Sequence, residues 1–176
     1  LSHIWFFMDA RQKEIHDRFG HHLRLRASGI CLNGDSILLV KHTGLGENKI
    51  LWTPPGGGLK FEETVQEALE REFLEETGLL IETKELLFVN EYFEHPLHAV
   101  ELFFEVEIMG GELMTGTDPE MNPDLQIIHE VRFMTFDEIR KSDPSIFHSL
   151  FSKYPNADSF QKKSVFQQNI LRRVAD

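Results

Sequence analysis

Alternating apolar and polar positions along the chain predict several strands. Residues 100–108 carry apolar side chains at every even position and mainly glutamate between them, which is the period of a strand with one solvated face. Other apolar runs rich in β-branched and aromatic residues predict strands at residues 23–32, 37–40, 50–53, 86–93 and 127–134. Asn33-Gly34-Asp35, between the first two of these runs, predicts a hairpin turn.

One helix is predicted over residues 65–77 from the signals at its two ends. Thr64 followed by Glu67 forms a capping box at its start, and Gly78 stands where a left-handed residue ends a helix. The glycine triplet 56–58, directly after two prolines, is expected in the interior of neither a helix nor a strand. The helix is therefore predicted to follow a glycine-rich loop.

Three segments in the second half complete the pattern. The stretch from Thr135 to Glu138 caps a short helix that ends before Pro144. Glycines and prolines make residues 110–126 a loop longer than compact domains usually carry without a function. Residues 158–174 are predicted to form an amphipathic helical tail, because apolar residues recur there at every fourth position.

The order of these elements predicts the domain organisation. Strands with interspersed helices in a chain of 176 residues indicate a single α/β domain over residues 23–176. Residues 1–22 are expected to pack on the core or on a second copy of the chain, a homodimer, since Trp5-Phe6-Phe7 would be costly in water. Cys31 is the single cysteine, so no disulfide can form within the chain, and a cytoplasmic location is expected.

The net charge of the chain is strongly acidic and unevenly distributed. With 18 basic and 29 acidic residues the formal net charge is −11, so stable binding of nucleic acid is not expected. No apolar run approaches the roughly 20 residues of a membrane span, so a membrane partner is not expected either. Seven glutamates and one arginine lie between residues 62 and 76, and this segment therefore carries more than half of the net charge.

Three of these glutamates occupy unfavourable positions on the predicted helix. Glu72 and Glu76 stand one turn apart beside the apolar stripe, and Glu75 flanks them. Like charges one turn apart repel, and carboxylates in the last turn also meet the negative end of the helix dipole. A divalent cation would neutralise them, and oxygen ligands suit Mg²⁺ or Mn²⁺. For Glu67 and Glu70 a solvated helix face is the sufficient explanation.

Residues 57–79, GGLKFEETVQEALEREFLEETGL, resemble the Nudix box. The glycine, glutamate and arginine positions of that pattern are filled by Gly57, Glu63, Arg71, Glu72, Glu75, Glu76 and Gly78. Phe73 departs from it, because an aliphatic residue is usual there, and we expect this side chain to pack toward the core. Residues 52–58 and 37–41 also resemble the segments that precede the box in the family.

The resemblance implies a Nudix-type α/β/α sandwich with a mixed sheet, in which the box forms a loop, a helix and a loop. It also implies hydrolysis of the diphosphate linkage in a nucleoside diphosphate derivative, dependent on Mg²⁺ or Mn²⁺. By position, the implied catalytic groups and metal ligands are Glu72, Glu75 and Glu76, with the carbonyl of Gly57 as a further ligand. Arg71 would orient a carboxylate, Glu63 would brace the loop, and Gly78 is structural.

Such a hydrolysis needs a base that takes a proton from the attacking water. Glu130 is the main candidate outside the box, because it faces away from Val131 in the predicted strand and could point to the metal. An exposed strand charge is the alternative interpretation of Glu130. Glu112 and Glu120, on the long loop, are weaker candidates.

Substrate contacts are predicted from basic and aromatic residues near the box. Arg26 and Lys41 are candidates to bind phosphate, with surface ion pairs as the alternative. Tyr92 and Phe103 are candidates to stack on a base, with core packing as the alternative. Pro96, seventeen residues past Leu79, lies close to the position of a proline found in the ADP-ribose branch of the family. The expected substrate is therefore an ADP-ribose-like compound or a nucleoside triphosphate.

Two other functions fit the same resemblance. A nucleotide-sensing Nudix-like module would bind its ligand without turnover, but such modules tend to lack the carboxylates that this chain retains. A diphosphate isomerase on the same fold would need a catalytic cysteine, and Cys31 lies in an apolar predicted strand. Hydrolysis is the preferred hypothesis of the three.

Overall fold

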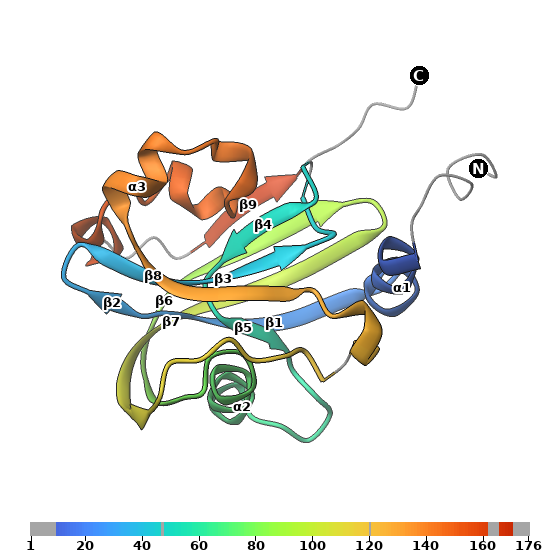
Figure 1. Cartoon of the computed structure of the whole chain (residues 1–176), viewed down its shortest axis with the longest axis horizontal. Helices are drawn as coiled ribbons and strands as arrows, with labels where there is room; N and C mark the ends of the chain where they lie inside the picture. Colours follow the sequence, from blue (N-terminus) through green and yellow to red (C-terminus); the bar gives the residue numbers. More distant parts are fainter. Residues whose placement is uncertain (1–9, 47, 120, 162–165, 171–176) are drawn as a thin grey trace.

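The computed structural model describes residues 10–46, 48–119, 121–161 and 166–170 (Figure 1). Its strands form two sheets. The first has the order β5 (Gly56–Gly58), β1 (Leu23–Ile30), β7 (Leu97–Gly111), β6 (Leu79–Glu94) and β9 (Phe166–Ile170). The second has β3 (Ser36–Thr43) between β4 (Ile50–Thr53) and β8 (Ile128–Thr135), with the short β2 (Leu32–Asn33) also paired to β3. Parallel and antiparallel pairings alternate along the first sheet, so that sheet is mixed.

The helices are α1 (Ala10–Phe19), α2 (Val65–Thr77) and α3 (Phe136–Lys141), followed by short 3₁₀ turns at Pro144–Ile146, Ser149–Ser152 and Ala157–Gln161. A further 3₁₀ turn, Pro123–Leu125, lies in the loop before β8. None of the helices in the described residues is long and apolar enough to cross a membrane.

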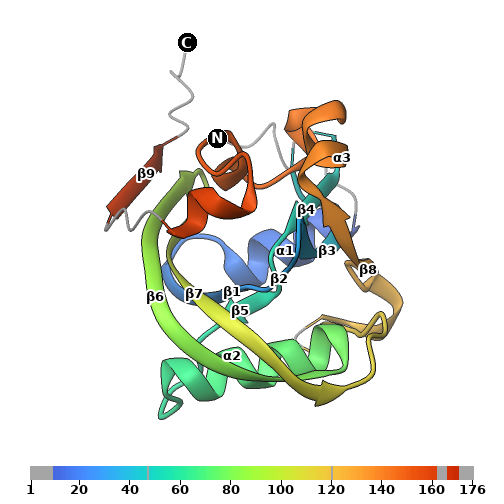
Figure 2. The same cartoon turned by 90° about the vertical axis from the view of Figure 1, so that its left-hand side faces the viewer.

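Side-chain alternation in β3 divides the core into two clusters. Leu38 and Val40 join a cluster that contains Phe73 of α2, whereas Ile37 and Leu39 join a cluster that contains Phe136 of α3. Figure 2 shows α2 and α3 on opposite sides of the sheets. The predicted α/β/α sandwich with a mixed sheet is confirmed.

The predicted helix and its two end signals are confirmed. Helix α2 spans Val65–Thr77, the capping box is present, and Gly78 adopts the left-handed conformation with φ of 72°. Phe73 is fully buried, as expected. Its ring fits because Gly29 of β1 has no side chain, since a Cβ there would lie 2.5 Å from Phe73 Cε2.

The glycine triplet corrects one prediction, because it forms the strand β5 instead of a loop. Gly57 pairs with Ala27 in an antiparallel ladder with β1. A Cβ on Gly56 would lie 2.2 Å from the carbonyl oxygen of Ala27. Glycine is thus required here for close approach of two backbones, and the turn preference of glycine is overridden.

The helical tail predicted over residues 158–174 is also wrong in its described part. A 3₁₀ turn occupies Ala157–Gln161, and β9 runs parallel to β6, with Val89 paired to Phe166 and Phe93 paired to Ile170. The backbone groups along this side of β6 are satisfied by pairing with β9, and this long-range pairing overrides the local helical period.

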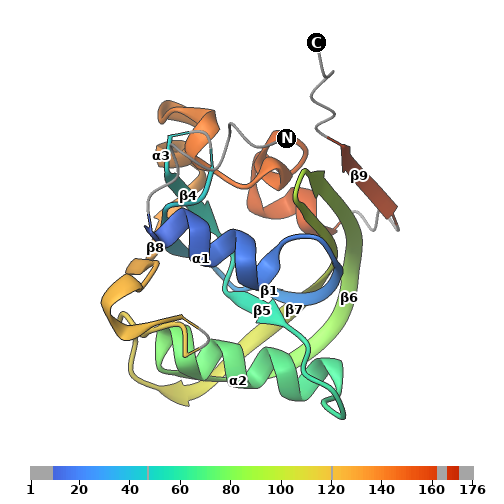
Figure 3. The same ribbon diagram turned by 90° about the vertical axis from the view of Figure 1, so that its right-hand side faces the viewer.

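Residues 10–22 pack on the core of the same chain. Ile15 of α1 is buried in the cluster that contains Phe73, and Gly20 forms a bridge to Leu97 at the start of β7. Figure 3 shows α1 against the beginning of β1 and above α2. The run Trp5-Phe6-Phe7 lies outside the described residues.

Candidate functional site

The second half of α2 presents two buried carboxylates to the glycine strand. Glu72 is 8% exposed and Glu76 is 5% exposed, although both are acidic. A Cβ on Gly57 would lie 2.2 Å from Glu72 Oε1, so only glycine allows this carboxylate to rest against the backbone of β5. The structure therefore brings together Gly57, Glu72 and Glu76.

Glu76 is held by two groups from other elements. Its Oε2 accepts the Gly56 N–H at 2.9 Å, and its Oε1 lies 3.7 Å from His42 Nε2. His42 is buried on β3, with Nδ1 3.5 Å from Thr53 Oγ1. Our sequence reasoning missed His42, although strand alternation places it on the same face as Val40, toward α2.

Arg71 connects the carboxylates of the motif. Its Nη1 donates to Glu72 Oε1 at 2.7 Å and to Glu75 Oε2 at 3.1 Å. Its Nε donates to Glu63 Oε1 at 2.7 Å, and its Nη2 donates to the carbonyl of Gly58 at 3.2 Å. The hydrogen bond with Arg71 holds the pKa of Glu63 well below its ordinary value, at about 2. Arg71 thus links the loop to two of the predicted metal ligands.

The long loop after β7 holds the C-terminal end of α2 through its backbone. The N–H groups of Met114, Gly116 and Thr117 donate to the carbonyls of Thr77, Glu76 and Glu75 at 2.9, 2.9 and 3.2 Å. These donors satisfy carbonyls that have no partner within the helix and oppose the negative end of its dipole. The sequence predicted a loop with a function here, but not this contact.

Burial and repulsion between the two carboxylates make ionisation of Glu72 unfavourable. Burial and then the charge of Glu76 raise the pKa of Glu72 to about 7, against the opposing effect of Arg71 and Arg26. A carboxylate pair of this kind fits a hard divalent cation in donor chemistry and in charge. Within the described ranges, however, no three acidic, histidine or cysteine side chains are gathered as a metal site. Glu75 faces Arg71, and it would have to turn away to bind the same ion as Glu72 and Glu76.

Comparison with known proteins identifies the family of this chain. The family model of the NUDIX domain matches residues 22–153. The chain belongs to the NUDIX family. The ADP-ribose pyrophosphatase of Methanocaldococcus jannaschii is 35% identical over 99 residues, and that match covers 55% of this chain and 58% of the relative. The chain thus matches just over half the length of this relative.

Solved structures show the same NUDIX fold. The NUDIX hydrolase from Nitrosomonas europaea superposes with a TM-score of 0.61 at 21% identity, over 73% of this chain and 83% of the other. The MutT NUDIX hydrolase from Burkholderia pseudomallei also gives 0.61, at 19% identity, over 81% of this chain and 99% of the other.

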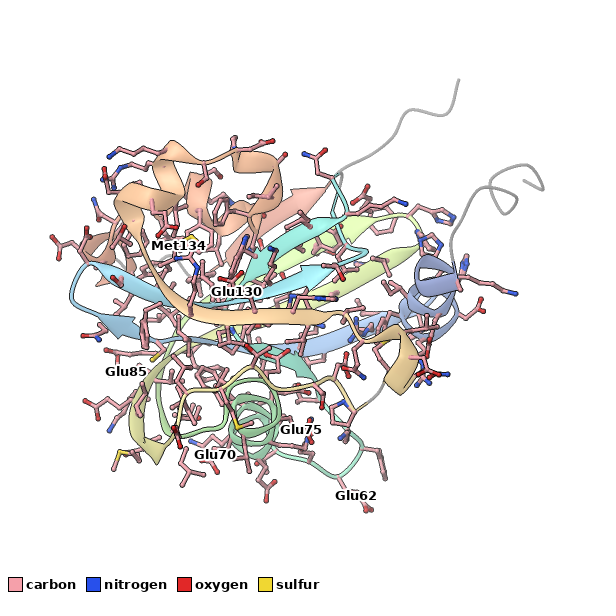
Figure 4. All side chains as sticks on the ribbon, in the orientation of Figure 1. Glu62, Glu70, Glu75, Glu85, Glu130 and Met134 are labelled. Atoms are coloured by element: carbon pink, nitrogen blue, oxygen red, sulfur yellow. The ribbon has the colours of Figure 1, made fainter. Side chains whose placement is uncertain are left out.

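Glu130 is not brought to the NUDIX motif. It lies on β8 beside Lys41 and Arg132, with nitrogen to oxygen distances of 3.7 and 3.1 Å. The Lys41 ammonium lies 5.7 Å from the ring centre of Trp52, so this group is on the sheet face opposite His42. Figure 4 shows Glu130 on β8 and Glu75 on α2, well separated. In the structure, Glu130 is a partly exposed charge on a strand, and Lys41 forms a surface ion pair with it. Both residues thus fit the alternative interpretations given for them.

Of the three other residues predicted to contact the substrate, only Arg26 lies against the glycine strand. Phe103 is 1% exposed and stacks on Phe88 with ring centres 4.6 Å apart, so it is a core residue and cannot stack on a base. Tyr92 is half-buried, and its hydroxyl donates to Glu94 Oε2 at 2.7 Å. Arg26 does reach the glycine strand, where its Nη2 donates to the Gly56 carbonyl at 3.1 Å.

The two loop candidates for the base are not placed at the carboxylates. Glu112 is exposed at the end of β7, where its backbone approaches Gly78. Glu120 lies outside the described residues.

A pocket of about 370 Å³ lies between the end of α1 and the start of β1 and borders Gly58, the last residue of β5. Its lining consists of Arg18, Phe19, His22, Leu23, Arg24, Leu25, Gly58 and Leu59. The guanidinium carbon of Arg24 lies 4.2 Å from the centre of the Phe19 ring. The described lining residues include bases and no acids, which suits an anionic ligand with an apolar part.

Proposed function

We propose that this NUDIX-family protein is a Mg²⁺- or Mn²⁺-dependent hydrolase that cleaves the diphosphate linkage of a nucleoside diphosphate derivative, with an ADP-ribose-like compound as the first candidate. The observation that carries this proposal is the buried pair Glu72 and Glu76 against the backbone of β5. The partial likeness to an ADP-ribose pyrophosphatase supports the choice of substrate.

The arrangement supports this proposal through its charge and its oxygen donors. A divalent cation, when bound, would screen the diphosphate and make water a better nucleophile. Glu72 and Glu76 would hold it with Glu75, and Arg71 keeps two of these carboxylates oriented. The pocket at Arg24 would bind an anionic part of the substrate away from the cleaved bond.

The two other functions have less support. Cys31 is buried, and burial raises the pKa of its thiol to about 11, so it would stay protonated in an isomerase reaction. A sensing module would have no need for three motif carboxylates with a bridging arginine. Calorimetry that showed tight nucleotide binding without product would favour the sensing function.

The test is a substrate panel with Mg²⁺ or Mn²⁺, containing ADP-ribose, other nucleoside diphosphate sugars and nucleoside triphosphates. Products are separated by ion-exchange chromatography. We expect cleavage of at least one member, loss of cleavage after chelation with EDTA, and loss of cleavage in Glu76→Gln. Glu70→Gln is the matched control, because Glu70 is an exposed carboxylate on the same helix, and it should keep its activity. No cleavage of any member, or full activity in Glu76→Gln, would contradict the proposal.

A further inference from the structure

A buried carboxylate outside the motif lies at the centre of a network of hydrogen bonds and an ion pair. Glu101 of β7 is 8% exposed, and the strand register places Arg26 of β1 and Asn90 of β6 directly beside it. Its Oε2 accepts Asn90 Nδ2–H at 2.8 Å and lies 3.1 Å from His148 Nε2. Its Oε1 lies 3.6 Å from Arg26 Nε. Three separate segments thus direct polar side chains at one carboxylate.

The direction of the histidine contact follows from its second ring nitrogen. His148 Nδ1 accepts the Leu150 N–H at 3.1 Å, so the ring proton lies on Nε2 and is donated to Glu101. Burial alone would raise the pKa of Glu101, but His148, Arg26 and Asn90 together lower it below the ordinary value. Glu101 is therefore ionised, and every contact it makes is with a donor.

The network continues from Arg26 to the candidate metal ligands. Arg26 Nη2 donates to the carbonyl of Gly56 at 3.1 Å, and the N–H of the same glycine donates to Glu76 Oε2 at 2.9 Å. Gly56 has φ of 149° and no room for a Cβ against Ala27. Its orientation is thus held on one side by Arg26 and on the other by Glu76.

We infer that Glu101 is a positioning residue for the motif: it pairs with Arg26, Arg26 holds the carbonyl of Gly56, and the N–H of that same glycine orients Glu76. Arg26 then acts through the backbone of β5 and not as a phosphate contact. This inference rests on the proposed function, because it assigns the network to the site that would bind the cation.

The test compares Glu101→Gln with the wild type. Glutamine keeps the volume, but its amide NH₂ would face donors that now find an acceptor, so Arg26 would lose its fixed position. We expect Mn²⁺ affinity, measured by electron paramagnetic resonance, or kcat to fall by about 10- to 100-fold, the range for groups that orient metal ligands. KM should stay close to that of the wild type, because the substrate pocket is not altered.

A second variant checks that the effect passes through Arg26. Arg26→Lys keeps the positive charge but cannot span both Glu101 and Gly56, so it should reproduce the loss. The double variant should lose little more than either single variant, because both break one chain of contacts. Fully additive losses would overturn the inference. If Glu101→Gln fails to fold, Arg26→Lys alone makes the Mn²⁺ measurement.

A buried control separates positioning from stability. Ile139→Ala removes a buried side chain of α3, in the cluster away from α2, and should lower the melting temperature without changing Mn²⁺ affinity. If Glu101→Gln behaves in the same way, Glu101 is only structural and the inference is wrong. If the wild type neither binds Mn²⁺ nor cleaves any substrate, the proposed function itself fails.

Discussion

The two ends of α2 are built on different principles. At the N-terminal end, Thr64 and Glu67 cap the helix with each other's side chain and backbone, at 2.9 Å from Thr64 N to Glu67 Oε2. At the C-terminal end, Glu76 contacts Gly56 and His42, and its carbonyl is held by the loop residue Gly116. The first end depends on neighbours in sequence, and the second depends on residues 20 to 40 positions away.

This difference separates the end of α2 that stabilises the fold from the end that carries the proposed site. The capping box places an acid at the positive end of the helix dipole, where it stabilises the fold. The acids at the other end oppose the dipole and repel one another, so they need support from distant donors. Such a conflict with local preferences is expected at a functional site.

The sharpest way to break the distant support is Gly116→Ala. A Cβ at this position would meet the Glu75 carbonyl oxygen of α2, so the loop must move away from the helix. We expect a loss of about 1–3 kcal/mol in the free energy of unfolding from this overpacking. Cleavage should also fall, on the order of tenfold or more, because the carbonyls of Glu75 and Glu76 lose their donors. Chemical denaturation and the rate of product formation give the two values.

Gly110→Ala is the matched control on the same side of the molecule. The nearest atom to a Cβ there is Leu80 Cδ1 at 3.8 Å, which is an ordinary contact. Stability and cleavage should be close to those of the wild type. Equal losses of stability and cleavage in the two variants would show that the backbone hydrogen bonds from the loop to the end of α2 have no special importance.

The local end should respond differently, in stability alone. Thr64→Ala removes the oxygen that accepts the Glu67 N–H, and loss of a cap costs about 1 kcal/mol. Below the melting transition, the rate per folded molecule should not change. Thr64→Ser keeps the hydroxyl and should restore most of the stability. A fall in kcat for Thr64→Ala at low temperature would mean that the two ends of α2 are coupled.

The smallest effect is expected in the turn that leads into the helix, where Glu62 has φ of 66°. Figure 4 shows this residue at the tip of the loop, away from α2. A left-handed conformation is unfavourable for a residue with a side chain, so Glu62→Gly should stabilise the protein by about 0.5–1 kcal/mol. Glu62→Ala keeps the unfavourable conformation and should give no gain. A thermal shift of the glycine variant equal to that of the alanine variant would contradict this explanation.

Local patterns predicted α2 well, because all of its signals lie within the helix and its flanks. The cap at Thr64, the left-handed Gly78 and the inward-facing Phe73 follow from spacing along one helix. The positions of Glu72 and Glu76 beside the apolar stripe of this helix were predicted in the same way. Their partners were not, because His42 belongs to a strand that meets the helix only after folding.

Other predictions failed where backbone pairing overrode local preference. The glycine triplet became β5 because it lies against β1, and residues 166–170 of the tail became β9 because they pair with β6.

Glu130 was expected near the metal ligands because it alternates with Val131. Alternation, however, predicts only which side of a strand a side chain is on, and it does not predict what that side faces. In the structure that side carries Lys41 and Trp52.

The family resemblance, helix α2 and the cluster of acidic residues in its last turns could all be predicted from the sequence, because each depends on spacings of a few residues. The tertiary structure decided which atoms hold those acids in place. Gly56 and His42 contact Glu76 from strands far from it in sequence, while Arg26 contacts Gly56 and Glu101 contacts Arg26. Strand pairing sets these distances, and the position of a pairing partner is not contained in any local pattern.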